Sequence, residues 1–167
     1  MKKSIIGWGL VAGAAGVVAM TLAETLEQLL TGRPNSYVPA HTAERLFGLE
    51  HRPDRGRVGL HWAMHLGQGL LGGVVRAWMA SRGIRGPVMS FMNTAMRLTL
   101  DQTLENATGV GAPPWTWPRD EQWIDLAHKA LYAYAAGAVA ERLIPAPQAG
   151  RPARSPADGW GWAHERP

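Results

Sequence analysis

The chain has 167 residues, enough for one domain with a substantial buried core. It contains no Cys, which excludes a disulfide framework, a thiolate metal site and a cysteine nucleophile. The net charge of +4 comes from arginines that are spread over the predicted loops and tail, without a basic stripe or a nucleic-acid-binding motif. We therefore expect no nucleic-acid partner.

The first predicted helix begins with an uncharged run from Ile5 to Ala23, preceded by two lysines. A run of this length crosses a bilayer core of ~30 Å. A secretory signal with its cleavage site near Ala23 is the alternative. The helical pattern nevertheless continues unbroken to a Gly-Pro stop at Gly32 and Pro34. The run therefore favours a membrane helix over a cleaved signal.

Three glycines, Gly9, Gly13 and Gly16, lie on one side of this predicted helix. Small residues at such spacing let membrane helices approach closely. The face therefore predicts tight helix packing, and we expect that it also offers a surface for a homo-oligomer.

Three further long helices follow, over residues 58–81, 87–106 and 123–144. The first of these is uncharged from Val58 to Val75 when its histidines are neutral. The second is interrupted within Pro87 to Leu104 by Arg97 and Asp101, and the third is purely apolar only from residue 130 to residue 140. They are weaker membrane candidates, and a soluble Ala-rich bundle stays an alternative.

A polar loop over residues 35–57 separates the first two long helices, and Thr42 to Leu49 predicts a short helix inside it with Thr42 as N-cap. The predicted fold is all-α: an up-and-down four-helix transmembrane bundle over residues 1–145 with this short extra helix. Residues 146–167, rich in Pro, Gly and Trp, predict a disordered tail. The lipid bilayer is the expected partner, and the expected location is integral to a membrane, the plasma membrane.

Each long helix carries a pair of ionisable residues at the end that would meet the others in an antiparallel bundle. Each pair is spaced i,i+3 or i,i+4 and therefore shares one side of its helix. At ~1.5 Å per residue all eight groups fall within about two helical turns of one end. The pairs are Glu24 and Glu27, His61 and His65, Asp101 and Glu105, and Asp125 and His128. The pattern predicts a polar site built among the helices.

Two kinds of chemistry fit this pattern. Asp125-x2-His128 has the carboxylate-x2-His spacing of di-iron bundles, although that pattern requires it twice and with Glu. A divalent metal would take its ligands from Glu24, Glu27, His61, His65, Asp101, Glu105 and His128. A metal-free pocket would use Arg97, paired inside the bundle with Asp101 or a carboxylate of the first helix. Glu24, Asp125 and His128 would join it for acid–base chemistry.

The preferred function is therefore a membrane protein whose polar pocket binds a small or lipid-soluble ligand. Three alternatives stay open. In the first, the protein is structural and its buried charges are internal salt bridges. In the second, the acids hold Mg²⁺ against a lipid or isoprenoid phosphate. In the third, the ionisable groups form a proton path. The last requires a relay across the membrane, whereas the far halves of the first and fourth helices are nearly all Ala, Gly and Val.

Two segments carry a family resemblance. Residues 36–42, Ser-Tyr-Val-Pro-Ala-His-Thr, and residues 101–120, with Gly-Val-Gly-Ala-Pro-Pro-Trp-Thr-Trp-Pro at their centre, resemble those of small four-helix proteins of bacteria and fungi that are predicted to lie in membranes. The likeness covers about residues 5 to 144 and implies a four-helix membrane fold. That family has no assigned activity, so the resemblance implies no catalytic residue.

Overall fold

The computed structural model describes residues 2–50 and 53–147, with side chains from residue 5 onward. Every regular element of these residues is a helix, which confirms the all-α prediction. The elements are α1 (Lys2–Thr31), α2 (Val38–Phe47), α3 (Val58–Ser81), α4 (Pro87–Ala107) and α5 (Arg119–Leu143), with 3₁₀ turns at Asp54–Gly56 and Pro114–Thr116. The predicted tail, apart from residues 146 and 147, lies outside the described residues.

Two helices begin earlier than their sequence predicts. α2 begins at Val38 and ends at Gly48, whose φ of 60° closes it, so the prediction that Thr42 is its N-cap is wrong. Pro39 explains the early start, because a proline in the first helical turn leaves no hydrogen bond unmade. α5 begins at Arg119, directly after Pro118, and has two acidic residues in its first turn, where the helix dipole favours them.

Helix α1 packs against both α3 and α5, and these are the most extensive helix contacts of the molecule. Glycines bring the backbones together: a Cβ atom placed on Gly73 would lie 2.2 Å from the backbone nitrogen of Gly13. A Cβ on Gly16 would lie 2.6 Å from the ring of Tyr132 on α5. The small-residue face of α1 is thus covered within this chain by α3 and α5.

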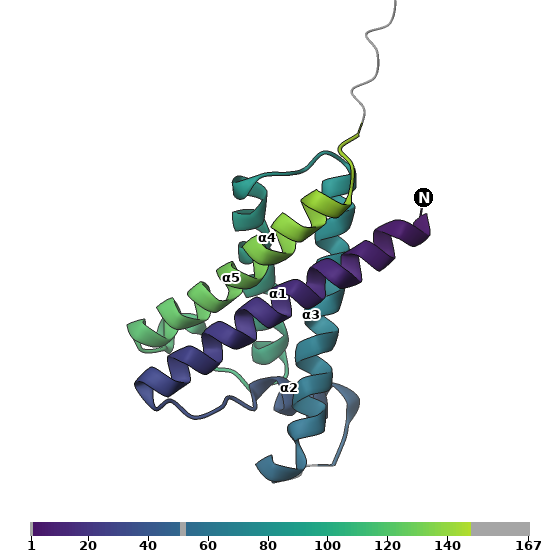
Figure 1. Ribbon diagram of the computed structural model, residues 1–167. Coiled ribbons are helices and arrows are strands. Elements are labelled where there is room, and N and C mark those ends of the chain that lie inside the picture. Colours follow the sequence, from purple (N-terminus) through teal and green to yellow (C-terminus); the bar gives the residue numbers. More distant parts are fainter. Residues whose placement is uncertain (1, 51–52, 148–167) are drawn as a thin grey trace, which may run out of the picture.

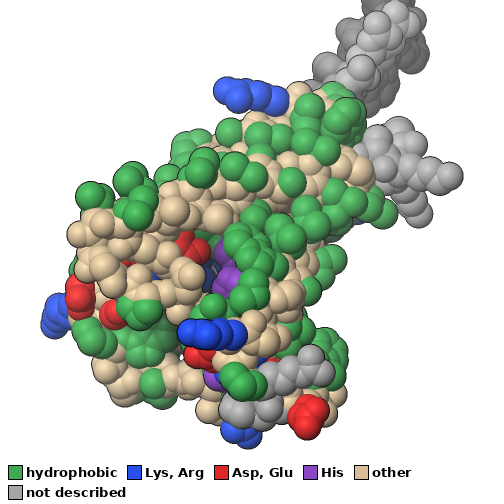
Figure 2. Space-filling model, turned by 60° about the horizontal axis from the view of Figure 1, so that its bottom comes forward, with side chains coloured by type: hydrophobic (Ala, Val, Ile, Leu, Met, Phe, Trp, Pro, Cys, Tyr) green, Lys and Arg blue, Asp and Glu red, His purple; other side chains and the backbone are tan. Residues whose placement is uncertain are grey.

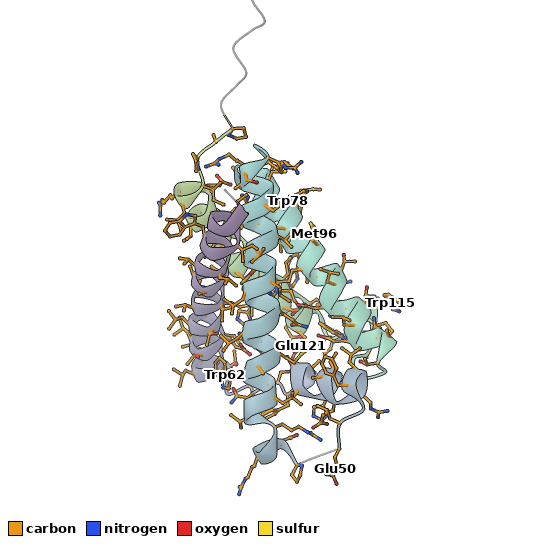
Figure 3. All side chains as sticks on the ribbon, turned by 90° about the vertical axis from the view of Figure 1, so that its right-hand side faces the viewer. Glu50, Trp62, Trp78, Met96, Trp115 and Glu121 are labelled. Atoms are coloured by element: carbon orange, nitrogen blue, oxygen red, sulfur yellow. The ribbon has the colours of Figure 1, made fainter. Side chains whose placement is uncertain are left out.

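The long helices run alternately down and up, but α3 and α4 are not packed side by side as their short connection predicts (Figure 1). α4 packs mainly against α5, and α2 contacts both α3 and α4 on the side away from their connection. Figure 3 shows that α3 and α4 diverge from their connection. One reason for the tight α4–α5 contact is Gly137, which leaves room for Ser90: a Cβ there would lie 2.4 Å from the Ser90 hydroxyl. The divergence leaves space for a polar cavity between α3 and α4.

Candidate functional site

A cavity of about 510 Å³ lies at the end of the bundle where α1 and α4 end and α3 and α5 begin. Figure 2 looks toward this end: acidic and histidine side chains show inside a hollow, whereas apolar side chains cover much of the surrounding surface. All four long helices contribute to its walls, and α2 and the 109–118 loop close the rest. The volume is in the range of cavities that hold small molecules.

Most of the predicted site residues line this cavity. They are Glu24, His61, His65, Arg97, Asp101, Glu105, Asp125 and His128. Glu27 is the exception: it faces Arg33, whose guanidinium lies 2.8 Å from its carboxylate. The i,i+3 and i,i+4 spacing thus places seven of the eight paired groups correctly, because α1, α3, α4 and α5 run antiparallel as expected.

The strongest electrostatic feature of the wall is a cluster of four groups on α4 and α5. Nε of Arg97 lies 3.6 Å from Asp101, four residues along α4, as the sequence predicts. Across the helix interface the ammonium of Lys129 lies 3.7 Å from Asp101 and also pairs with Asp125. Both cations are largely buried, with side chains 10% and 8% exposed. The buried positive charges are therefore each next to a carboxylate, as buried ions must be.

Arg97 has a second contact that the sequence does not reveal. Its guanidinium carbon lies 4.4 Å from the ring centroid of Tyr132, so the cation stacks on an aromatic face. The hydroxyl of Tyr132 in turn donates to the carbonyl of Gly69 on α3. Nε of Arg97 is buried and has no hydrogen-bond partner among the described residues. Its polar contact is the ion pair with Asp101 at 3.6 Å.

The two histidines of α3 stack on each other, with ring centroids 5.8 Å apart and ring planes at 14°. His65 is also 3.3 Å from the hydroxyl of Thr21 on α1, which orients its ring. No three His, Asp or Glu side chains of the described residues come close enough to share one metal ion. The arrangement therefore supports hydrogen bonding more directly than metal ligation, and the metal stays a prediction.

Glu105 is a carboxyl group of the wall with a strongly raised pKa. Burial raises its pKa from 4.5 to about 7, with the nearby Lys129 opposing the shift and Asp101 and Asp125 adding to it. At neutral pH this group therefore exchanges a proton readily. Arg33, at the cavity rim, has its pKa raised further by its hydrogen bonds to Glu27 and stays a fixed cation.

The sequence argument missed Lys129 and Arg33 as wall residues. A signal for Lys129 was present, because it follows Asp125 by four residues and such pairs meet on a helix face. Arg33 could not be found this way, since it lies in the loop after α1 and reaches Glu121 on α5 at 3.8 Å only in the folded chain.

Comparisons of the chain with protein-family models, with curated proteins and with solved structures found no match. The family resemblance of the sequence therefore stays a prediction. What the chain does must be argued from its own geometry.

Proposed function

We propose that the chain is a small integral membrane protein whose helical bundle holds, at one end, a polar pocket for a small or lipid-soluble ligand. The observation that carries the membrane part is an inverted distribution of side chains. Leu22, Leu71 and Phe91 are 66%, 68% and 59% exposed, whereas Arg76 is 0% and Thr94 1% exposed.

In water a folded chain places leucine inside and arginine outside. In hydrocarbon the opposite holds, because ionised groups are costly against lipid and turn to the bundle interior. Exposed large apolar side chains occur on α1, α3, α4 and α5, and the charges of α3 and α4 are buried or half-buried. This distribution supports a bundle surrounded by lipid.

Within the described residues, only α1 over Ile5–Thr31 is long and apolar enough to be recognised as a membrane span from its composition, and a signal sequence or a core helix would pass the same test. The other long helices are more polar: α3 carries two histidines and a glutamine among its apolar residues, and α4 and α5 carry several charges. The cations Arg76 on α3, Arg97 on α4 and Lys129 on α5 are all buried. In our proposal the bilayer surrounds residues 5–23 of α1 and 87–104 of α4, which leaves Glu105 outside the span, at the polar end.

The pocket part of the proposal is supported by the cavity and its chemistry. The wall offers the buried guanidinium of Arg97 and a carboxyl group, Glu105, with a pKa of about 7. These groups suit a ligand with a hydrogen-bond acceptor, and the carboxyl group suits proton transfer to or from it. The competing structural function is favoured by the pairing of Lys129 with Asp101 and Asp125. A purely structural cluster, however, leaves a cavity of about 510 Å³ unexplained.

A substitution test separates a lipid-facing surface from a water-facing one. Leu71→Lys on α3 places a cation on the exposed apolar face. If this face is in water, the stability of the protein should hardly change; if it is in lipid, the protein should lose about 3 kcal/mol of stability. We expect wild-type protein to resist alkaline carbonate extraction from membranes, and Leu71→Lys to lower its yield and thermal stability. Leu49→Lys, on an exposed leucine after α2, is the control and should have little effect.

Release of the intact wild-type chain by mild lysis without detergent, or equal stability of the two variants, would refute the membrane part.

For the pocket part, Leu104→Trp fills the cavity from its own wall. Native mass spectrometry of protein purified from its membranes should show a bound small molecule in the wild type and not in Leu104→Trp. Identical spectra of the two proteins would favour the structural function.

A further inference from the structure

A second hollow of about 460 Å³ lies between α4 and α5, and it differs in character from the polar cavity. Its walls are mainly apolar and aromatic: Leu98, Leu126, Pro114, Trp117 and Trp123 contribute to them. Trp123 is 68% exposed. We call this hollow the α4–α5 groove.

One polar side chain in the groove lacks partners. Gln102 lines it, and both atoms of its carboxamide, Nε2 and Oε1, are buried without a hydrogen-bond partner among the described residues. A buried polar atom without a hydrogen-bond partner is destabilising, so two in one amide are unusual. A ligand that accepts from Nε2 and donates to Oε1 would satisfy both.

The charges around the groove decide the kind of head group. Asp125 is the charged residue of its wall, and no Lys or Arg lines it. A phosphate or a carboxylate placed there would find no cation facing it and would lie near a carboxylate. An uncharged head group meets neither difficulty. The volume suits one apolar chain, because it lies in the range of cavities that hold drug-sized ligands.

We propose that the α4–α5 groove binds a single-chain amphiphile with an uncharged head group, in which a hydroxyl donor stands next to a carbonyl acceptor, as in a monoacylglycerol. The apolar chain lies against Leu98, Leu126 and the two tryptophans, and the head group hydrogen-bonds to the amide of Gln102. Tryptophans at such a groove are typical of the level where lipid head groups meet the hydrocarbon. The groove shares Trp117 and Asp125 with the wall of the polar cavity, whereas Gln102 lines the groove alone.

The test uses the full chain in detergent and three probes with the same C18 chain: a monoacylglycerol, a fatty acid at pH 9 and a lysophosphatidic acid. Native mass spectrometry titrates each. We expect the monoacylglycerol to bind about tenfold or more tightly than the two anionic probes. Gln102→Leu, which keeps the size and removes the amide, should weaken monoacylglycerol binding by about tenfold.

Two further variants keep the result decisive. Gln68→Leu makes the same chemical change in the polar cavity, outside the groove, and should bind monoacylglycerol as the wild type does. Leu126→Trp fills the groove and should abolish binding while Gln102 is unchanged. The proposal is overturned if Gln102→Leu binds like the wild type, if Gln68→Leu weakens binding as much, or if the anionic probes bind equally well.

Discussion

The ammonium of Lys129 on α5 lies 3.7 Å from the carboxylate of Asp101 on α4, and both side chains are largely buried. This pair joins α4 to α5 through buried charges of opposite sign. It also forms part of the wall of the polar cavity. Stability and site geometry therefore depend on the same contact.

Lys129→Met should destabilise the protein by about 3–5 kcal/mol, because it leaves Asp101 and Asp125 as buried carboxylates without their shared cation. Thermal unfolding in detergent measures the loss. The double variant Lys129→Met with Asp101→Asn should regain part of it, since one of the stranded charges is gone. Arg119→Met, on an exposed cation of the same helix, is the control and should change stability by no more than about 0.5 kcal/mol. Equal effects of Lys129→Met and Arg119→Met would show that the pair is exposed.

Replacing two glycines of α3 by alanine should change the free energy of unfolding in opposite directions. A Cβ on Gly73 would lie 2.2 Å from the backbone of Gly13 on α1, so Gly73→Ala must push the helices apart and should cost about 1–3 kcal/mol. A Cβ on Gly67 meets nothing within 4 Å, so Gly67→Ala should stabilise the helix by about 0.5–1 kcal/mol. Chemical or thermal unfolding of both variants measures this. Two changes of the same sign would contradict the close α1–α3 contact.

Glu105 should make stability depend on pH. Its pKa is about 7 in the folded chain against an ordinary value of 4.5, so the folded state keeps a proton that the unfolded state has lost between these values. Its contribution to stability should therefore fall as the pH rises from about 4.5 to about 7 and change little above that. Comparing unfolding of the wild type with Glu105→Gln across this range isolates the effect, because glutamine does not titrate. Parallel pH profiles of the two proteins would contradict the raised pKa.

Tyr132 should stabilise the protein in two ways, through its hydroxyl and through its aromatic ring. Its hydroxyl donates to the carbonyl of Gly69, and its ring carries the guanidinium of Arg97. Tyr132→Phe removes only the hydroxyl and should cost about 1 kcal/mol. Tyr132→Leu also removes the aromatic face. It should lower the free energy of unfolding clearly more, because it leaves a cavity and removes the stacking on Arg97. Similar thermal stabilities of the two variants would mean that the stacking contributes nothing.

The sequence predicts the all-α class and most of the cavity wall, because both depend on local periodicity: apolar runs define helices, and i,i+4 spacing brings pairs such as His61 and His65 together. It predicts helix starts poorly, since Pro39 and Pro118 allow α2 and α5 to begin in what reads as loop. The divergence of α3 and α4 could not be predicted either, because it follows from contacts between segments far apart in the chain. The same is true of the stacking of Arg97 on Tyr132.

The distribution of ion pairs along the chain bears on how the proposed membrane bundle is assembled during synthesis. Arg76 of α3 finds its carboxylate at Glu141, and Asp101 of α4 finds its lysine at Lys129. Both partners are on α5, which leaves the ribosome after α3 and α4. Until α5 arrives, α3 carries an arginine without its acid, and moving such a charge into hydrocarbon alone is costly. In the proposed membrane bundle, α3, α4 and α5 should therefore insert into the bilayer together, once α5 has been synthesised.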